Sequence, residues 1–176
     1  TRKAQSAIRT AQSIHAAADL ASGKPESQAT RIDAAYEAMA LFDEHTWGSA
    51  DPWLTRLETF DSGDLQWHRK SDFAHEASEE TASLLDAGVH RLAAAYAPAD
   101  GAIASLLVFN PVAFERDALV RAFLPAERVS LDESFALVDA ASGAGIAYVA
   151  EPQAHSQYRA AGQWVVFTAP RLPSMG

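Results

Sequence analysis

The chain has 176 residues, 48% of them hydrophobic and 21% charged, which suits one domain or two small ones with a real core. Its 14 Lys and Arg stand against 23 Asp and Glu, a formal charge of -9, and form no basic stripe. This argues against nucleic acid as a partner, because holding phosphate backbones needs clustered Lys and Arg. The absence of cysteine excludes disulfides and thiolate metal sites.

No apolar run approaches the length needed to span a bilayer, and residues 1–9 lack the shape of a signal peptide. We therefore expect no membrane association and a cytoplasmic location. The chain begins abruptly inside a helical pattern, so we expect it to be a piece of a longer protein.

The first 60 residues follow the spacing of amphipathic helices. In residues 1–22 the apolar positions recur every three or four residues, at Ala4, Ile8, Ala11, Ile14 and Ala18. Gly23 ends this helix, and Pro25 with Glu26 starts a second one in its first turn. The short connection predicts antiparallel packing of the two helices. A short third helical stretch is predicted over residues 52–60.

A long helix is predicted over residues 64–97. Its apolar positions again fall at spacings of three and four, namely Trp67, Phe73, Ala74, Ala77, Leu84, Leu85, Val89, Leu92 and Tyr96. Gly88 lies in its middle and weakens the helical pattern. Pro98 and the pair Asp100–Gly101 end the helix. Residues 1–98 are therefore predicted to form a three-helix bundle.

The second half changes to short apolar runs divided by turn residues. Five strands are predicted, over residues 103–109, 119–124, 135–139, 146–150 and 164–169. Frequent turn signals between short strands favour an antiparallel sandwich or barrel. The predicted fold class is therefore α+β, with the helical bundle followed by a small antiparallel β-sandwich at residues 99–176.

Residues 41–53, which read LFDEHTWGSADPW, carry the densest group of chemically active side chains. Asp43, Glu44 and His45 adjoin one another, and Trp47 and Trp53 lie on either side of a turn at Gly48. Such a loop between helices is a typical place for binding residues. The alternative is a capping segment whose tryptophans fill a core.

The other histidines offer one further metal pattern. His68, Asp72 and His75 have spacings of four and three, which place them on one helical face able to ligate a metal. Charged neighbours surround this face, so a solvated face is the better interpretation. His15 and His90 are predicted to be structural, and nothing marks His155 as functional.

No complete active site emerges from the residues alone. The chain has no G-x-S-x-G turn, no glycine-rich phosphate loop and no H-E-x-x-H zinc motif. Asp43 and Glu44 are adjacent, so they need not face one bond as the two carboxylates of a glycosidase must.

Four stretches in order nevertheless resemble one family. FDEHTWGS at residues 42–49, QWHRKSDFAHEA at 66–77, LVFNPVAFERDALV at 107–120 and WVVFTAPRLPSMG at 164–176 are similar to parts of the glycoside hydrolase family 38 α-mannosidases, especially bacterial ones. The first two resemble the middle helical domain of that family. The last two resemble the beginning and end of its first small C-terminal β domain.

The resemblance implies a retaining enzyme that cleaves α-mannosidic bonds and holds zinc. The missing partners would be an N-terminal (β/α) catalytic domain, which supplies the nucleophile and most zinc ligands, and further C-terminal β domains. His45 matches the histidine that the helical domain adds to zinc. Asp43, Glu44, Trp47 and Trp53 would line the carbohydrate site, and the isolated chain would be inactive and hold no stoichiometric zinc.

The chain departs from the family at the residue after His45. Better-known members carry an aspartate there and this chain carries Thr46, which leaves open whether Asp43 or Glu44 takes the role of that acid. The competing interpretation is a non-enzymatic interaction module in which the DEHTWG loop only docks against a neighbouring domain.

Overall fold

The structure is a computed structural model, and it describes residues 2–44, 56–57, 60–132 and 134–176. The chain divides into two compact units, Thr1–Ala95 and Tyr96–Gly176, and each has its own hydrophobic core. Three helices precede a small antiparallel sheet, which confirms the predicted α+β class. Among the helices that the structure describes, none has the length and apolar content to cross a membrane.

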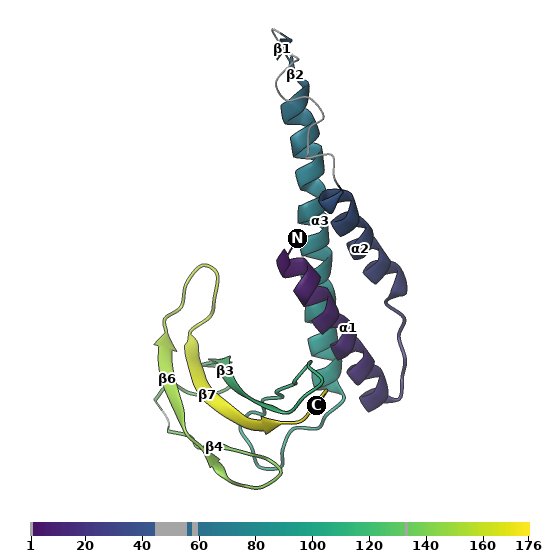
Figure 1. The fold of residues 1–176 in the computed structure, drawn as a ribbon. Coiled ribbons are helices and arrows are strands. Elements are labelled where there is room, and N and C mark those ends of the chain that lie inside the picture. Colours follow the sequence, from purple (N-terminus) through teal and green to yellow (C-terminus); the bar gives the residue numbers. More distant parts are fainter. Residues whose placement is uncertain (1, 45–55, 58–59, 133) are drawn as a thin grey trace. The chain divides into compact units, whose positions relative to one another are not determined.

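The helical unit contains α1 (Arg2–Ser22), α2 (Ala29–Asp43) and the long α3 (Ser62–Ala94). Both shorter helices pack against α3 (Figure 1). The helices α1 and α2 are antiparallel, as the short connection predicted, because Gln5 near the start of α1 donates to Asp43 at the end of α2 over 2.7 Å. Gly23 has the left-handed φ of 63° that lets it end α1.

Small side chains fill the core of the helical unit. They let the helices approach closely around a few larger residues, and the buried set is Ala4, Ile8, Ala11, Ala35, Ala38, Met39, Ala77 and Leu84. Gly88 has a packing role in this core that the sequence pattern did not predict. A Cβ on Gly88 would lie 3.1 Å from the His15 ring and from Ile14, so glycine allows α1 and α3 to pack at this point.

Two helical predictions were wrong in their bounds. The second helix begins at Ala29, not at Pro25, because polar contacts hold the connecting segment outside the helix: Asp19 accepts from the Glu26 amide over 3.2 Å. The short helix predicted at residues 52–60 is contradicted where it is described. Arg56–Leu57 (β1) and Phe60–Asp61 (β2) pair as antiparallel strands, while residues 52–55 and 58–59 lie outside the described chain.

The predicted apolar face of α3 was wrong at its ends. Trp67 is 50% exposed and Val89 is 48% exposed, and Tyr96 lies beyond the helix. Lys70 and Thr81 are buried instead. The buried stripe therefore runs through polar positions that a hydrophobic pattern does not detect.

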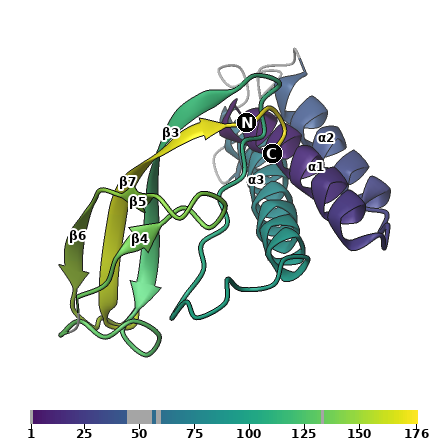
Figure 2. The same cartoon turned by 90° about the horizontal axis from the view of Figure 1, so that it is seen from below.

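The β unit is built on a three-stranded antiparallel sheet, shown in Figure 2. The strands β3 (Arg116–Pro125) and β6 (Tyr148–Gln153) flank the central β7 (Gly162–Leu172). A separate ladder joins β4 (Leu137–Val138) to β5 (Gly145–Ile146), and its side chains Leu137 and Ile146 pack against the core of the sheet. The small antiparallel β unit is thus confirmed, whereas a sandwich of two full sheets is not.

The strand predicted at residues 103–109 was wrong. This run belongs to no strand, and its side chains Ile103 and Leu107 are 66% and 47% exposed. A short apolar run is compatible with a strand, but strand formation also requires a partner for the backbone. The central strand β7 already has β3 and β6 as its two neighbours.

Asn110 joins two of the family-like stretches within the β unit. It is fully buried, and its side-chain amide donates to the carbonyls of Phe114 and Pro173 over 2.8 Å each. Its side-chain oxygen accepts from Arg116 Nε over 2.9 Å. The Asn110 side chain therefore joins the loop at residues 110–116 to the turn at residues 172–176, which backbone hydrogen bonds from Asn110 to Gly176 and from Met175 to Val112 also connect.

Candidate functional site at the end of the second helix

The helix α2 ends at Asp43, two residues before His45, the histidine singled out by the sequence. Asp43 Oδ2 accepts from Gln5 Nε2 of α1, and Asp43 borders a shallow groove between α1 and α2 that Arg9 and Tyr36 also line. Its carboxylate is therefore engaged toward α1. Glu44 follows as the C-cap with φ −61° and ψ 154°, so the backbone has already left the helical conformation at that residue.

Glu44 is held on the opposite side, by α3. Lys70 Nζ lies 2.9 Å from the Glu44 carbonyl oxygen and 2.5 Å from its Oε1. The Lys70 side chain is only 11% exposed, and lysine is rarely buried unless it is paired. A cation at the end of a helix also lies at the negative end of the helix dipole. Lys70 therefore fixes both the backbone and the carboxylate of the residue that precedes His45.

The two carboxylates bind different helices. Asp43 bonds to α1 and Glu44 bonds to α3, on different neighbours of α2. A retaining glycosidase needs two carboxyl groups about 5 Å apart across the scissile bond. His45, Trp47 and Trp53 lie outside the described part of the chain.

The alternative metal face on α3 is not formed. His68, Asp72 and His75 are all exposed, and across residues 2–44, 56–57, 60–132 and 134–176 no group of three or more His, Cys, Asp or Glu side chains could hold a metal ion. A stable zinc site uses three or four protein ligands.

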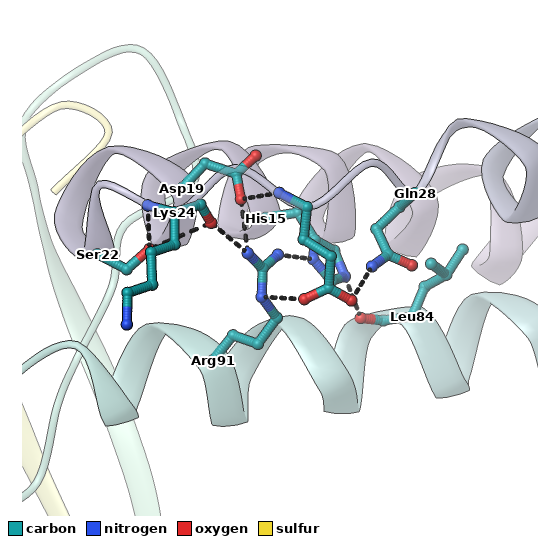
Figure 3. Close-up of polar contacts among 8 residues, drawn as sticks. His15, Asp19, Ser22, Lys24, Gln28, Leu84 and Arg91 are labelled. Atoms are coloured by element: carbon teal, nitrogen blue, oxygen red, sulfur yellow. Dashed lines mark hydrogen bonds and ion pairs between the residues drawn. The ribbon is translucent and has the colours of Figure 1, made fainter.

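A second polar cluster joins α1 to α3, and Figure 3 shows it. His15 is 4% exposed, its Nε2 lies 2.9 Å from the Leu84 carbonyl, and its Nδ1 lies 3.0 Å from Arg91. Arg91 has only donors and a carbonyl only accepts, so Nδ1 accepts and Nε2 carries the proton. His15 is thus a neutral core histidine with both nitrogens bonded, which supports its predicted structural role.

Arg91 extends this cluster to the segment between α1 and α2. It donates to Asp19 Oδ1 over 2.6 Å and pairs with Glu26 Oε2 over 3.1 Å. The hydrogen bond from Arg91 is the largest influence that lowers the pKa of Asp19 below its ordinary value. His90, the other histidine predicted to be structural, is exposed, and its ring contacts Asp86 in the preceding turn of α3. His155 is exposed in the loop after β6.

Lys70 and Arg91 are the residues that sequence reasoning missed at these two clusters. Lys70 was treated as one of the charged neighbours of a solvated face, and Arg91 was not singled out. A signal for Lys70 was present, because it precedes the buried Ala77 and Leu84 by seven and fourteen residues. Positions seven apart occupy nearly the same face of a helix, so a lysine there has to be buried with a partner.

Comparison with known proteins adds no assignment. No protein-family model, curated protein or solved structure matches the chain.

Proposed function

We propose that the chain is part of a retaining, zinc-dependent, α-mannosidase-like glycoside hydrolase and supplies one zinc ligand, His45. The observation that carries the proposal is the end of α2. A helix closes at Asp43, Glu44 is clamped by the next helix, and the family-like histidine follows directly, in the order that the resemblance requires. The contact between Asn110 and Pro173 supports it further, because it unites two stretches that resemble one β domain.

In this proposal the chain binds and orients but does not cleave. Zinc would hold adjacent sugar hydroxyls and favour a distorted ring when bound. His45 would offer a neutral imidazole nitrogen as one of its ligands. Trp47 and Trp53 would supply apolar ring area beside the sugar, and Asp43 would remain the acid on the α1 side.

Glu44 has a different role in the proposal from the other carboxylate. Its contact with Lys70 makes it a structural residue that ends α2, so Asp43 is the better candidate for an acid at the substrate wall. Asp43 would need to exchange Gln5 for a substrate hydroxyl.

A docking module is the second candidate, favoured by the start of α3. Trp67 is 50% exposed and Leu65 is 54% exposed, and exposed aromatic groups of this kind are enriched where proteins associate. The two candidate functions differ in whether binding depends on zinc. A docking module keeps its binding partner when zinc is removed, whereas the hydrolase loses its sugar site.

The test uses the full-length protein that contains this chain, with His45→Ala as the variant. The proposal predicts that this change lowers both zinc content and hydrolysis of an aryl α-mannoside, whereas the exposed His90→Ala leaves both unchanged. Full zinc content and full rate in His45→Ala would reduce His45 to a turn residue. Turnover by the isolated 176-residue chain, lost on a conservative change within it, would contradict the requirement for a catalytic domain elsewhere.

A further inference from the structure

We propose that the β unit binds a second copy of this chain, edge to edge along β3, with Leu119 at the twofold axis. The inference is independent of the proposed zinc ligand, because it uses only the sheet of the β unit. It starts from the free edges of that sheet. In the strand order β3-β7-β6, β7 has a neighbour on both sides, whereas β3 and β6 each leave one edge unpaired among the described residues (Figure 2).

The two free edges differ in how well they are protected against another strand. The strand β6 has six residues, which include the charged Glu151 and Pro152, a residue without an amide hydrogen. The strand β3 has ten residues, and its segment 118–124 reads ALVRAFL, with Arg121 as its one charge. A long and largely apolar edge strand is a template for pairing with another chain. The free edge of β3 is therefore the better candidate for an interface.

The exposed face of β3 carries the side chains that would meet in such a pair. Val120 and Ala122 pack against the core of the β unit. Because side chains alternate along a strand, Asp117, Leu119 and Arg121 lie on the opposite face. Leu119 is 77% exposed, and the Arg121 side chain is 51% exposed. A second strand alongside β3 would remove part of this leucine from water, which favours association.

Charge distinguishes the registers centred near the middle of β3. In an antiparallel pair with its twofold axis at Leu119, Asp117 of each copy lies opposite Arg121 of the other, so two pairs of opposite charge form. An axis at Arg121 would place the two arginines opposite each other, which is destabilising. The axes between Leu119 and Arg121 place no two charges opposite each other. The Leu119 register is therefore the favoured one, and it also buries the two leucines against each other.

The contacts that both charged residues make within one chain are compatible with this pairing. Asp117 Oδ1 accepts from the Arg171 amide over 2.7 Å, and a carboxylate can accept further hydrogen bonds. Arg121 lies over the Trp164 ring, 3.9 Å from its centroid, and contacts Glu151 over 3.1 Å. Both of these Arg121 contacts are exposed, and exposed contacts of either kind are weak. Exchanging Glu151 for Asp117 of the second copy therefore costs little.

The first experiment uses the 176-residue chain, which has no cysteine, so that one introduced cysteine reports on one position. Leu119→Cys places two thiols opposite each other at the twofold axis, within reach of a disulfide. Val149→Cys, at a position that is 64% exposed on β6, is the matched control for random collisions. We expect oxidation to convert most of Leu119→Cys, and little of Val149→Cys, to a disulfide-linked dimer. Equal cross-linking of the two variants would overturn the proposal.

The second experiment measures the dimer affinity of the unmodified chain and of two charge variants by analytical ultracentrifugation. Arg121→Glu places like charges opposite each other twice, so we expect dimerisation to weaken about 10-fold or more. Glu151→Gln removes the same ion pair within one chain and leaves the β3 edge intact, so its dimer affinity should stay within about 2-fold of wild type. Circular dichroism checks that both variants remain folded. A chain that is monomeric at every concentration, or equal dimer affinity in the two variants, would overturn pairing along β3.

Discussion

The two polar clusters of the helical unit differ in what they enclose. Between α1 and α3, His15, Arg91 and Asp19 satisfy one another across two helices and the adjoining segment. At the end of α2, Lys70 binds Glu44, which is the last described residue before position 56. The first cluster closes a helix contact. The second fixes the point from which the family-like loop begins.

The difference shows why the presence of a histidine is a poor guide to a site. His15 is buried and fully bonded, so it has no nitrogen available for a ligand. The functional assignment rests on His45, and the described residues bear on it only through the lysine that holds its neighbour.

The largest effect on stability is expected from His15→Ala. The change removes a buried ring between α1 and α3 and leaves Arg91 without one of its acceptors, so we expect a loss of about 3 kcal/mol in the free energy of unfolding. His90→Ala, on the exposed side of α3, should change it by less than about 0.5 kcal/mol. Urea unfolding of both variants measures the difference. Equal stability would show that the α1–α3 cluster does not hold the helices together.

A smaller effect of opposite sign is expected from Thr81→Val. The Thr81 hydroxyl is buried in α3 and has no hydrogen-bond partner among the described residues. Replacing an unsatisfied buried polar group with an apolar group of the same shape should stabilise the helical unit by up to about 1 kcal/mol. Thr81→Ser keeps the hydroxyl and loses a methyl group, so it should destabilise. A loss of stability in Thr81→Val would mean that the hydroxyl has a partner.

The pH dependence of stability should reveal the bond between Arg91 and Asp19. Because that bond lowers the pKa of Asp19 in the folded chain, the stabilisation is present above the unfolded value of about 3.9 and is lost as pH falls through the lower, folded value. The free energies of unfolding of wild type and Asp19→Asn should therefore differ most above about pH 4. The difference should shrink in more acidic solution. A difference in the free energy of unfolding that grows on acidification would contradict a stabilising bond between Arg91 and Asp19.

The smallest expected effect concerns which ring nitrogen of His15 carries the proton. The contacts of His15 require the neutral tautomer with the proton on Nε2. Nitrogen-15 NMR of the ring at neutral pH should show a protonated Nε2 and an unprotonated Nδ1. The opposite tautomer, or an imidazolium ring, would mean that Arg91 does not donate to His15.

The sequence predicted the parts of the fold that follow from periodicity and end signals. Gly23 directly follows the last residue of α1, as predicted. The central strand β7 contains the predicted run at residues 164–169. The sequence predictions failed where contacts between distant parts of the chain decide the local structure. The run at residues 103–109 has the composition of a strand and no partner strand, and Pro25 resembles a helix start although the segment there bonds back to Asp19.

The candidate site could be predicted less completely. Motif order singled out the end of α2, and the structure shows that Asp43 and Glu44 bond to different helices. That separation, and the burial of Lys70, depend on residues 26 to 38 positions away in the chain. Local pattern contains no information on such pairs, and only the spacing of Lys70 from Ala77 and Leu84 gave a hint.

The most direct test of the central claim is the zinc stoichiometry of the full-length protein and of the 176-residue chain, purified in parallel and measured by mass spectrometry of the metal. The claim is that this chain supplies one ligand to a site completed elsewhere. It predicts about one zinc per full-length molecule and no stoichiometric zinc on the isolated chain. Zinc bound equally well by the isolated chain, or no zinc on the full-length protein, would contradict it.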